Sequence, residues 1–142
     1  MNSSLPSADK DPMGAAIADY YNLHKAGRLR VFSSLFDEDE IPVKDLFRGL
    51  KQMPVIEQTA LQMAEGKILD VGAGSGCHSL ALQEMNKEVC AIDISALSVE
   101  VMKKRGVKDA RLVNLFDATF HEQFDTILLL MNGSGIIGKI EN

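Results

Sequence analysis

Three short motifs, each placed where an apolar run ends, hold the residues of this chain best suited to binding a ligand. The first, ILDVGAGSG at residues 68–76, places Asp70 before Gly72, Gly74 and Gly76. Glycine reaches backbone conformations that side chains forbid, and a missing Cβ lets a ligand lie against the main chain. We therefore expect a ligand-binding turn here, with Gly76 letting the turn enter the next helix closely.

The spacing of the glycines and the acid before them indicate the kind of ligand. A dinucleotide-binding turn has glycine at its first, third and sixth positions, but the sixth position here is Cys77. A negative charge at the position of Asp70 does not help to bind a pyrophosphate, but it helps to bind a cation. S-adenosylmethionine carries a sulfonium and an amino group, so we expect Asp70 to attract it, directly or through water. Holding the turn by hydrogen bonds is an alternative role, compatible with the first.

The second motif, AIDIS at residues 91–95, places Asp93 21 positions after Gly72. An acid about 20 residues beyond such a turn is typical of ribose recognition. We expect Asp93 to accept both ribose hydroxyls and Ile94 to lie on the adenine face, while Ser95 caps a helix. A capping role for Asp93 itself is the alternative.

The third motif, NLFDA at residues 114–118, follows the next expected strand. We predict that Asp117 accepts a proton from the exocyclic amine of adenine, while Phe116 or Ala118 lines the ring. Asn114 is an alternative for the same hydrogen bond. The other interpretation of Asp117 is an exposed loop acid.

These motifs need a scaffold in which strands and helices alternate. Apolar runs and helical periodicity predict strands at 67–71, 88–92, 111–113 and 124–130, and helices at 77–85 and 96–104. Alternation with short connections implies a parallel sheet that binds ligands at the carboxyl ends of its strands.

The residues before the first of these strands are predicted to form an extension. We expect a disordered tail over 1–11, a helical extension over 12–66 and a cofactor-binding half domain over 67–142. Within the extension, the pattern predicts a helix that Asp11 caps, a loop over residues 28–40, a short helix over 43–50, and a helix after Pro54 that buries Val55 and Ile56.

The composition limits the binding partners and the cellular setting that we expect for this chain. Across 142 residues the formal net charge is −5, which argues against binding to phosphate backbones. The two cysteines do not have the spacing of a disulfide framework or a zinc site, so a reducing, cytoplasmic setting without a metal is expected. No apolar run reaches the ~18 residues of a membrane span, and no targeting signal is visible.

Together with FDTILLLMNGSG at residues 124–135, the three motifs resemble successive motifs of class I S-adenosylmethionine-dependent methyltransferases. The resemblance implies an α/β Rossmann-like parallel sheet, incomplete here, with about four strands in the order 3-2-1-4. It implies that the glycines hold the methionine part of S-adenosylmethionine, Asp93 the ribose and Asp117 the adenine. It also implies methyl transfer to an acceptor without a metal.

The resemblance leaves the acceptor and the catalytic residues unassigned. The loop after the fourth strand, residues 131–135, lacks the Asp/Asn-Pro-Pro-aromatic pattern of many amino-group methyltransferases. A small-molecule acceptor is expected by default. Tyr20, Tyr21 and His24 are either part of a lid over the cofactor or simple packing residues, and neither His78 nor His121 is given a role.

The sequence ends at Asn142, where members of this family begin a helix after the fourth strand. A truncated chain is therefore expected, with its fourth strand as an exposed apolar edge that favours a homodimer. Two other functions remain as alternatives, a non-catalytic S-adenosylmethionine-binding or scaffold module and a fragment of an NAD(P)-binding dehydrogenase.

Overall fold

The computed structural model describes residues 4–25, 27–32, 34–35 and 37–131. A four-stranded parallel sheet lies at its centre, in the order β5-β4-β3-β6. This is the predicted α/β Rossmann-like order 3-2-1-4. The strands are β3 (Lys67–Val71), β4 (Glu88–Asp93), β5 (Ala110–Leu112) and β6 (Thr126–Leu128).

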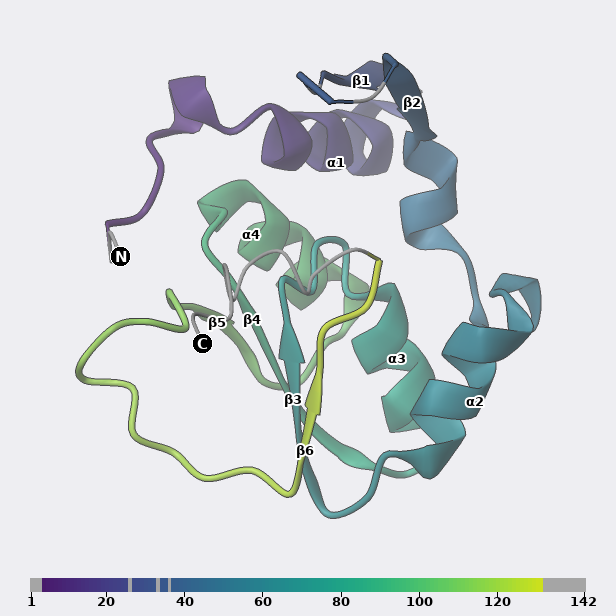
Figure 1. Ribbon diagram of the computed structural model, residues 1–142, viewed down its shortest axis with the longest axis vertical. Helices are drawn as coiled ribbons and strands as arrows, with labels where there is room; N and C mark the ends of the chain where they lie inside the picture. The colour runs from purple at the N-terminus through teal and green to yellow at the C-terminus, as the bar shows by residue number, and fades with distance from the viewer. Residues whose placement is uncertain (1–3, 26, 33, 36, 132–142) are drawn as a thin grey trace.

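Helices cover one face of this sheet (Figure 1). They are α2 (Val55–Met63), α3 (Cys77–Glu84) and α4 (Ala96–Arg105). Side chains alternate along a strand, so Ile68 and Val89 point to the same face and pack with Leu61 and Leu82 of the helices. Ala91 of β4 packs on α4 in a second cluster with Val99 and Met102, among others.

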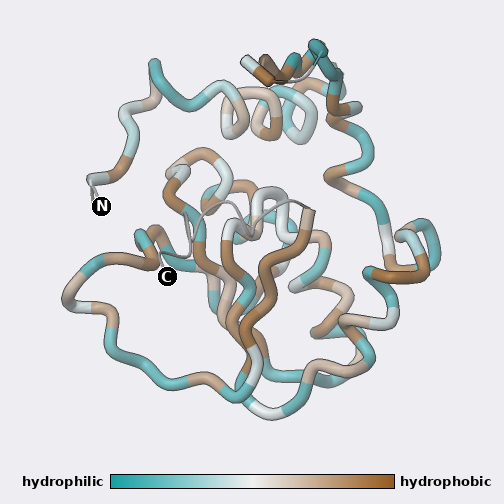
Figure 2. The backbone as a smooth tube through the Cα atoms, in the orientation of Figure 1, coloured by the Kyte–Doolittle hydropathy of each residue, from teal (hydrophilic) through white to brown (hydrophobic). Residues whose placement is uncertain are grey.

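The opposite face is covered, among the described residues, by the segment between β5 and β6. Leu69, Val71, Cys90 and Ile92 form a buried cluster there, and partly buried apolar side chains of this segment pack against it. Figure 2 shows the corresponding apolar stretches along the strands. Because both faces of β3 and β4 are buried, these strands hold the ends of their loops in fixed positions.

The extension starts with α1 (Pro12–Leu23), which lies across the end of the sheet where β3 ends (Figure 1). Asp11 caps this helix, as predicted, by accepting a hydrogen bond from the Gly14 N–H at 2.8 Å. Short elements then lead to α2, namely β1 (Arg28–Val31), β2 (Asp39–Pro42), and the 3-10 turns η2 (Val43–Phe47) and η3 (Leu50–Gln52).

The loop predicted over residues 28–40 was wrong, because β1 and β2 form an antiparallel hairpin. The acidic run faces the two arginines of the other strand. Arg28 pairs with Glu40 at 3.5 Å and Arg30 with Glu38 at 3.1 Å. Opposite charges across a hairpin favour its pairing, and the second half of the acidic run, Asp39 and Glu40, belongs to β2.

Three other expectations in the extension differ from the structure. Residues 4–11, predicted to be a disordered tail, include the 3-10 turn η1 (Ala8–Lys10) and the buried Asp11. The helix expected over 43–50 is two 3-10 turns. Val55 and Ile56 are 77% and 79% exposed, because α2 packs through Leu61 near its other end.

Within the half domain, the predicted elements agree closely with the structure. Ser95 caps α4 by accepting from the Ser98 N–H at 3.0 Å, and Gly106 ends that helix in the left-handed conformation. The strand predicted over 124–130 is shorter, since β6 pairs with β3 only through Thr126–Leu128. None of the helices in the described ranges has the length and apolar character needed to cross a membrane.

Candidate cofactor-binding site

A cavity of about 270 Å³ lies at the carboxyl ends of β3 and β4. This is the end of a parallel sheet where ligands bind in open α/β folds. The lining comes from both the half domain and the extension: Met13, Ile17, Ile41, Leu46, Asp70, Val71, Gly72, Ala73, Gly74, Ser75, Cys77, His78, Asp93, Leu130 and Met131.

The glycine-rich turn forms one wall of this cavity. Gly72, Gly74 and Gly76 all have positive φ angles, of 66°, 58° and 82°. The N–H groups of Gly72 and Ala73 donate to the Ile92 carbonyl, which fastens the turn to β4. A Cβ on Gly74 would stand 3.6 Å from Cδ1 of Ile17, so the missing side chain keeps space open between the turn and α1.

Gly76 has a different role from the other two glycines. It does not line the cavity, and a Cβ there would stand 2.8 Å from Val107 and 2.9 Å from Met102. The close approach of α3 to α4 therefore requires glycine at this position, which agrees with the predicted tight entry into the helix.

Asp70 is buried at the base of the cavity, with 1% of its surface exposed. It accepts a hydrogen bond from the Ser79 hydroxyl at 2.7 Å. Burial raises the pKa of Asp70 and outweighs this hydrogen bond, which lowers it. This bond joins β3 to α3, the two elements on either side of the turn, and Asp70 also lines the cavity.

Asp93 lines the cavity from the end of β4 and is fixed by two backbone donors. One carboxylate oxygen accepts from the Gly74 N–H at 2.8 Å and the other from the Ser95 N–H at 2.9 Å. Burial raises the pKa of Asp93, those two bonds lower it, and the nearby Asp11 raises it. A carboxylate can accept about four hydrogen bonds, so Asp93 keeps acceptor capacity for a ligand hydroxyl.

The other predicted contacts lie outside the cavity lining. Ile94 is 45% exposed beside Asp93. Asp117 accepts from the backbone N–H and the hydroxyl of Thr119, both at 2.8 Å, and these bonds lower its pKa. Ala118 is exposed. The Val113 N–H donates to the Asp93 carbonyl, which places the start of this loop beside the end of β4.

The extension supplies a wall that the motifs did not reveal. Met13 and Ile17 of α1, Ile41 of β2 and Leu46 of η2 all line the cavity. The sequence pattern predicts a helix that Asp11 caps, but it gives no indication of which cavity the residues of this helix face. Tyr20, Tyr21 and His24, which were suggested as lid residues, are not part of the cavity lining. Tyr20 packs on the ring of Phe47, with 4.7 Å between the ring centroids.

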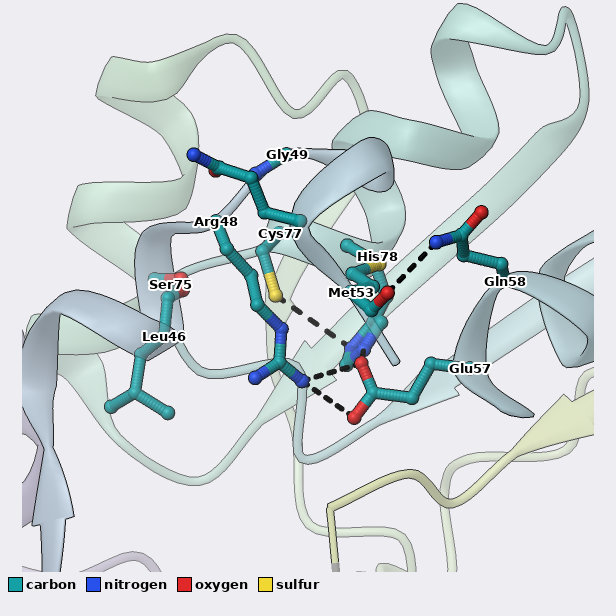
Figure 3. A network of polar contacts seen from close by, with 10 residues as sticks. Leu46, Arg48, Gly49, Met53, Glu57, Gln58, Ser75, Cys77 and His78 are labelled. Carbon is teal, nitrogen blue, oxygen red and sulfur yellow. Dashed lines mark hydrogen bonds and ion pairs between the residues drawn. The ribbon is translucent and has the colours of Figure 1, made fainter. Parts of the chain in front are cut away.

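A partly buried ion-pair network joins the extension to the start of α3 (Figure 3). Glu57 of α2 accepts from Arg48 at 2.5 Å with both oxygens, and one of these oxygens lies 3.1 Å from Nε2 of His78. The His78 Nδ1 lies 3.8 Å from the sulfur of Cys77. No sequence motif indicates that Glu57 and His78 are partners, because the two residues are far apart along the chain.

The charge of His78 follows from these neighbours. Burial lowers its pKa, but the contacts with Cys77, the charge of Asp70 and the bond to Glu57 together raise it to about 9. Arg48 and His78 in turn hold the pKa of Glu57 below its ordinary value against the effect of burial. At neutral pH the network therefore consists of two cations around one carboxylate.

Ser75 at the tip of the turn is held from two sides. Its hydroxyl donates to the Leu46 carbonyl of η2 (Figure 3). The Arg105 guanidinium of α4 donates to the Ser75 carbonyl at 2.7 Å and lies over the Phe47 ring at 4.8 Å. These contacts connect the turn with both α4 and the extension. Within the described ranges no three His, Cys, Asp or Glu side chains are grouped so that they could hold a metal.

Comparison with known proteins gives consistent results. A family model described as a methyltransferase domain matches residues 68–136. The chain is 76% identical, with a TM-score of 0.92, to a SAM-dependent methyltransferase from Bacteroides fragilis crystallised with S-adenosyl-L-homocysteine, over 98% of this chain. It is 31% identical over 70% of its length to the cypemycin N-terminal methyltransferase of a Streptomyces species. An uncharacterized methyltransferase of Staphylococcus carnosus (strain TM300) is 35% identical over 46% of the chain.

These relatives are longer than the present chain. The matches cover 58% of the Bacteroides fragilis protein, 43% of the Streptomyces protein and 31% of the Staphylococcus carnosus protein. The family model covers residues 68–136, which include the glycine-rich turn, so this match bears on the cavity described above.

Proposed function

The chain belongs to the class I S-adenosylmethionine-dependent methyltransferases, and we propose that it binds S-adenosylmethionine and transfers its methyl group to an acceptor. The observation that carries this proposal is the pairing of an open glycine turn with two carboxylates, Asp70 and Asp93, in one cavity. A cofactor with a sulfonium, an amino group and a ribose fits such a donor and acceptor set. The activity that we propose is the one named for the longer methyltransferase to which this chain is similar.

The residues that line the cavity also support this cofactor. Gly72 and Gly74 leave the main chain bare on the side of the cavity, where a Cβ on Gly74 would point toward Ile17. The methionine part would lie against this turn, near Asp70. The ribose would lie at Asp93, whose carboxylate orientation is fixed by Gly74 and Ser95. Pre-positioned acceptors of this kind reduce the entropy lost on binding.

The adenine would extend from Asp93 past the cavity described here. The exposed Ile94 offers an apolar surface for the ring, and Asp117 and Ala118 follow the strand that pairs with β4. Asp117 keeps one carboxylate oxygen outside its bonds to Thr119. We propose that this oxygen accepts from the adenine amine.

The bound cofactor supplies an electrophilic methyl group, and the residues of this chain act by positioning and by excluding water. Asp93 would set the ribose, and Asp70 would set the charged amino acid end. Met13 and Ile17 would cover the sulfonium side with apolar surface, which strengthens the attraction to nearby carboxylates.

We propose a small-molecule acceptor. The negative net charge of the chain supports this over a nucleic acid. The similarity to the cypemycin N-terminal methyltransferase adds an amino terminus as a second candidate. The two kinds of acceptor differ in size, and an assay that offers both of them shows which one is methylated.

The test is to incubate the chain with S-adenosylmethionine and a panel of small amines, thiols and phenols, together with a peptide with a free amino terminus. Formation of S-adenosylhomocysteine would be measured by mass spectrometry. Turnover with an acceptor, absent in Asp93→Ala, supports methyl transfer. Tight cofactor binding with no turnover for any acceptor would favour a non-catalytic binding module, and binding of NADH instead would favour a dehydrogenase.

The predicted homodimer and the division into an extension (12–66) and a half domain (67–142) remain proposals. The exposed side chain of Ile127 on β6 supports an apolar edge in the described part of the chain. Sedimentation velocity at two concentrations tests the dimer, and a single monomeric species at both would contradict it.

A further inference from the structure

We propose that Asp11 is a positioning residue that, through Ser95, couples the docking of α1 over the cavity to the ribose-binding carboxylate of Asp93. This inference rests on the proposed function, because it assigns Asp93 to the cofactor. It concerns a residue outside all three ligand-binding motifs. The assignment follows from a continuous set of hydrogen bonds between α1 and the turn.

The first step is the connection between two helix ends. The Ser95 hydroxyl donates to one carboxylate oxygen of Asp11, and the other oxygen accepts from the Gly14 N–H at 2.8 Å. The same Ser95 oxygen accepts from the Ser98 N–H at 3.0 Å. Asp11 and Ser95 therefore cap α1 and α4 and also bond to each other. Both side chains are buried, with Asp11 8% and Ser95 5% exposed.

The second step leads from Ser95 to the cavity. The Ser95 N–H donates to one oxygen of Asp93 at 2.9 Å, and the other oxygen accepts from Gly74 at 2.8 Å. Ser95 thus holds Asp93 through its backbone and Asp11 through its side chain. A shift of Ser95 relative to α1 changes the support of the carboxylate that faces the ligand.

The third step concerns what Asp11 holds in place. Met13 and Ile17, one and two turns into α1, line the cavity opposite Gly74. Gly14 lets α1 come this close, because a Cβ there would stand 2.1 Å from Asp11 and 2.2 Å from Ser95. If the bond between Asp11 and Ser95 is lost, the wall formed by α1 loses a polar attachment beside the ribose site.

Coupling of this kind is reciprocal. A cofactor held by Asp93 and covered by α1 stabilises the docked helix, and the docked helix in turn slows cofactor release. Loss of one buried hydrogen bond to a charged group is expected to raise the dissociation rate of S-adenosylhomocysteine about tenfold. The association rate is expected to change less.

The variants must separate this coupling from simple helix capping. Asp11→Ala removes both the cap and the bond to Ser95. Asp11→Ser keeps a good cap for Gly14 but removes the charged carboxylate oxygen to which Ser95 donates. Asp9→Ala is the matched control, because Asp9 lies exposed in η1 and touches neither helix end.

The experiment measures S-adenosylhomocysteine dissociation by stopped flow and amide hydrogen exchange in α1 with and without the ligand. We expect Asp11→Ser to release the ligand about tenfold faster than wild type, like Asp11→Ala, and to exchange α1 amides faster. We expect the ligand to slow α1 exchange in wild type and in Asp9→Ala, and to slow it less in Asp11→Ser.

A dissociation rate for Asp11→Ser equal to that of wild type would overturn the coupling and leave Asp11 as a helix cap alone. Unchanged α1 exchange in that variant without ligand would overturn the attachment itself. If wild type does not bind S-adenosylhomocysteine, the proposed function fails and the coupling fails with it, while α1 exchange in the ligand-free variants still decides the attachment.

Discussion

The half domain and the extension contribute opposite walls of one cavity, but they are held by different forces. The strands β3 and β4 are buried on both faces, and Ile68, Leu69 and Ile92 are at most 1% exposed. The extension meets them partly through apolar side chains of α2, such as Leu61, and partly through polar attachments, chiefly Glu57 with His78 and Asp11 with Ser95. Polar attachments break singly, whereas an apolar core unfolds as a unit. We therefore expect the polar attachments of α1 to break more readily than the core around β3 and β4.

The largest effect is expected from the apolar core of the half domain. Leu69→Ala removes a fully buried side chain between β3 and the covering segment, and it should destabilise the protein by about 3 kcal/mol. Urea unfolding would measure this loss. Ile127→Ala, in the same sheet at a side chain 56% exposed, is the control and should cost less than about 1 kcal/mol. Equal losses would contradict the assignment of the core.

A smaller effect, with a distinct pH dependence, is expected from the ion-pair network. The pKa of His78 is raised to about 9, above the ordinary value of 6.5. Stabilisation by the charged His78 is therefore complete below about pH 6.5 and is lost as the pH rises through about 9. Glu57→Gln should cost on the order of 2 kcal/mol at pH 6 and less at pH 9.5, where the pair with His78 is gone and only the pair with Arg48 is left to lose.

Urea unfolding of wild type and Glu57→Gln at these two pH values tests this prediction. Glu100→Gln is the control, because its pair with Lys104 lies on the surface and should contribute little at either pH. If the free energy of unfolding differs between wild type and Glu57→Gln by the same amount at both pH values, His78 does not carry the charge assigned to it.

A third effect concerns the end of α2. The Lys87 ammonium donates to the carbonyls of Leu61, Gln62 and Ala64, each at 2.8 Å. A cation at a helix C-terminus satisfies free carbonyls and complements the helix dipole. Lys87→Met should cost about 1 kcal/mol in thermal unfolding, whereas Lys108→Met, at an exposed site, should not. Equal melting temperatures for the two variants would refute this attachment.

The smallest effect is expected at Asp117. Its carboxylate is already bonded to Thr119, and it lies outside the cavity lining. Asp117→Asn should weaken S-adenosylhomocysteine binding by no more than about threefold. A larger loss of affinity in titration calorimetry would place Asp117 among the principal cofactor contacts. It would also shift the assigned site toward the loop that follows β5.

The half domain was predictable from sequence because its determinants are local. The ends of β3, the caps of α4 and the glycine turn follow from residues within a few positions of one another, such as Ser95 with Ser98. The extension was not predictable in the same way. The partners of Glu57 and Asp11 are distant in sequence, and the hairpin depends on ion pairs between separated charges. No local sequence pattern therefore indicates that Met13 and Leu46 form part of the cavity wall.

The most direct test of the cofactor site is calorimetric titration of the wild-type chain and Asp93→Ala with S-adenosylmethionine, S-adenosylhomocysteine and NADH. Far-UV circular dichroism would establish that the variant is folded. We predict saturable binding of the two sulfur compounds at one site per chain, at least tenfold weaker in Asp93→Ala, and no binding of NADH. Equal binding by wild type and Asp93→Ala, or no binding by the folded wild type, would contradict the assigned site.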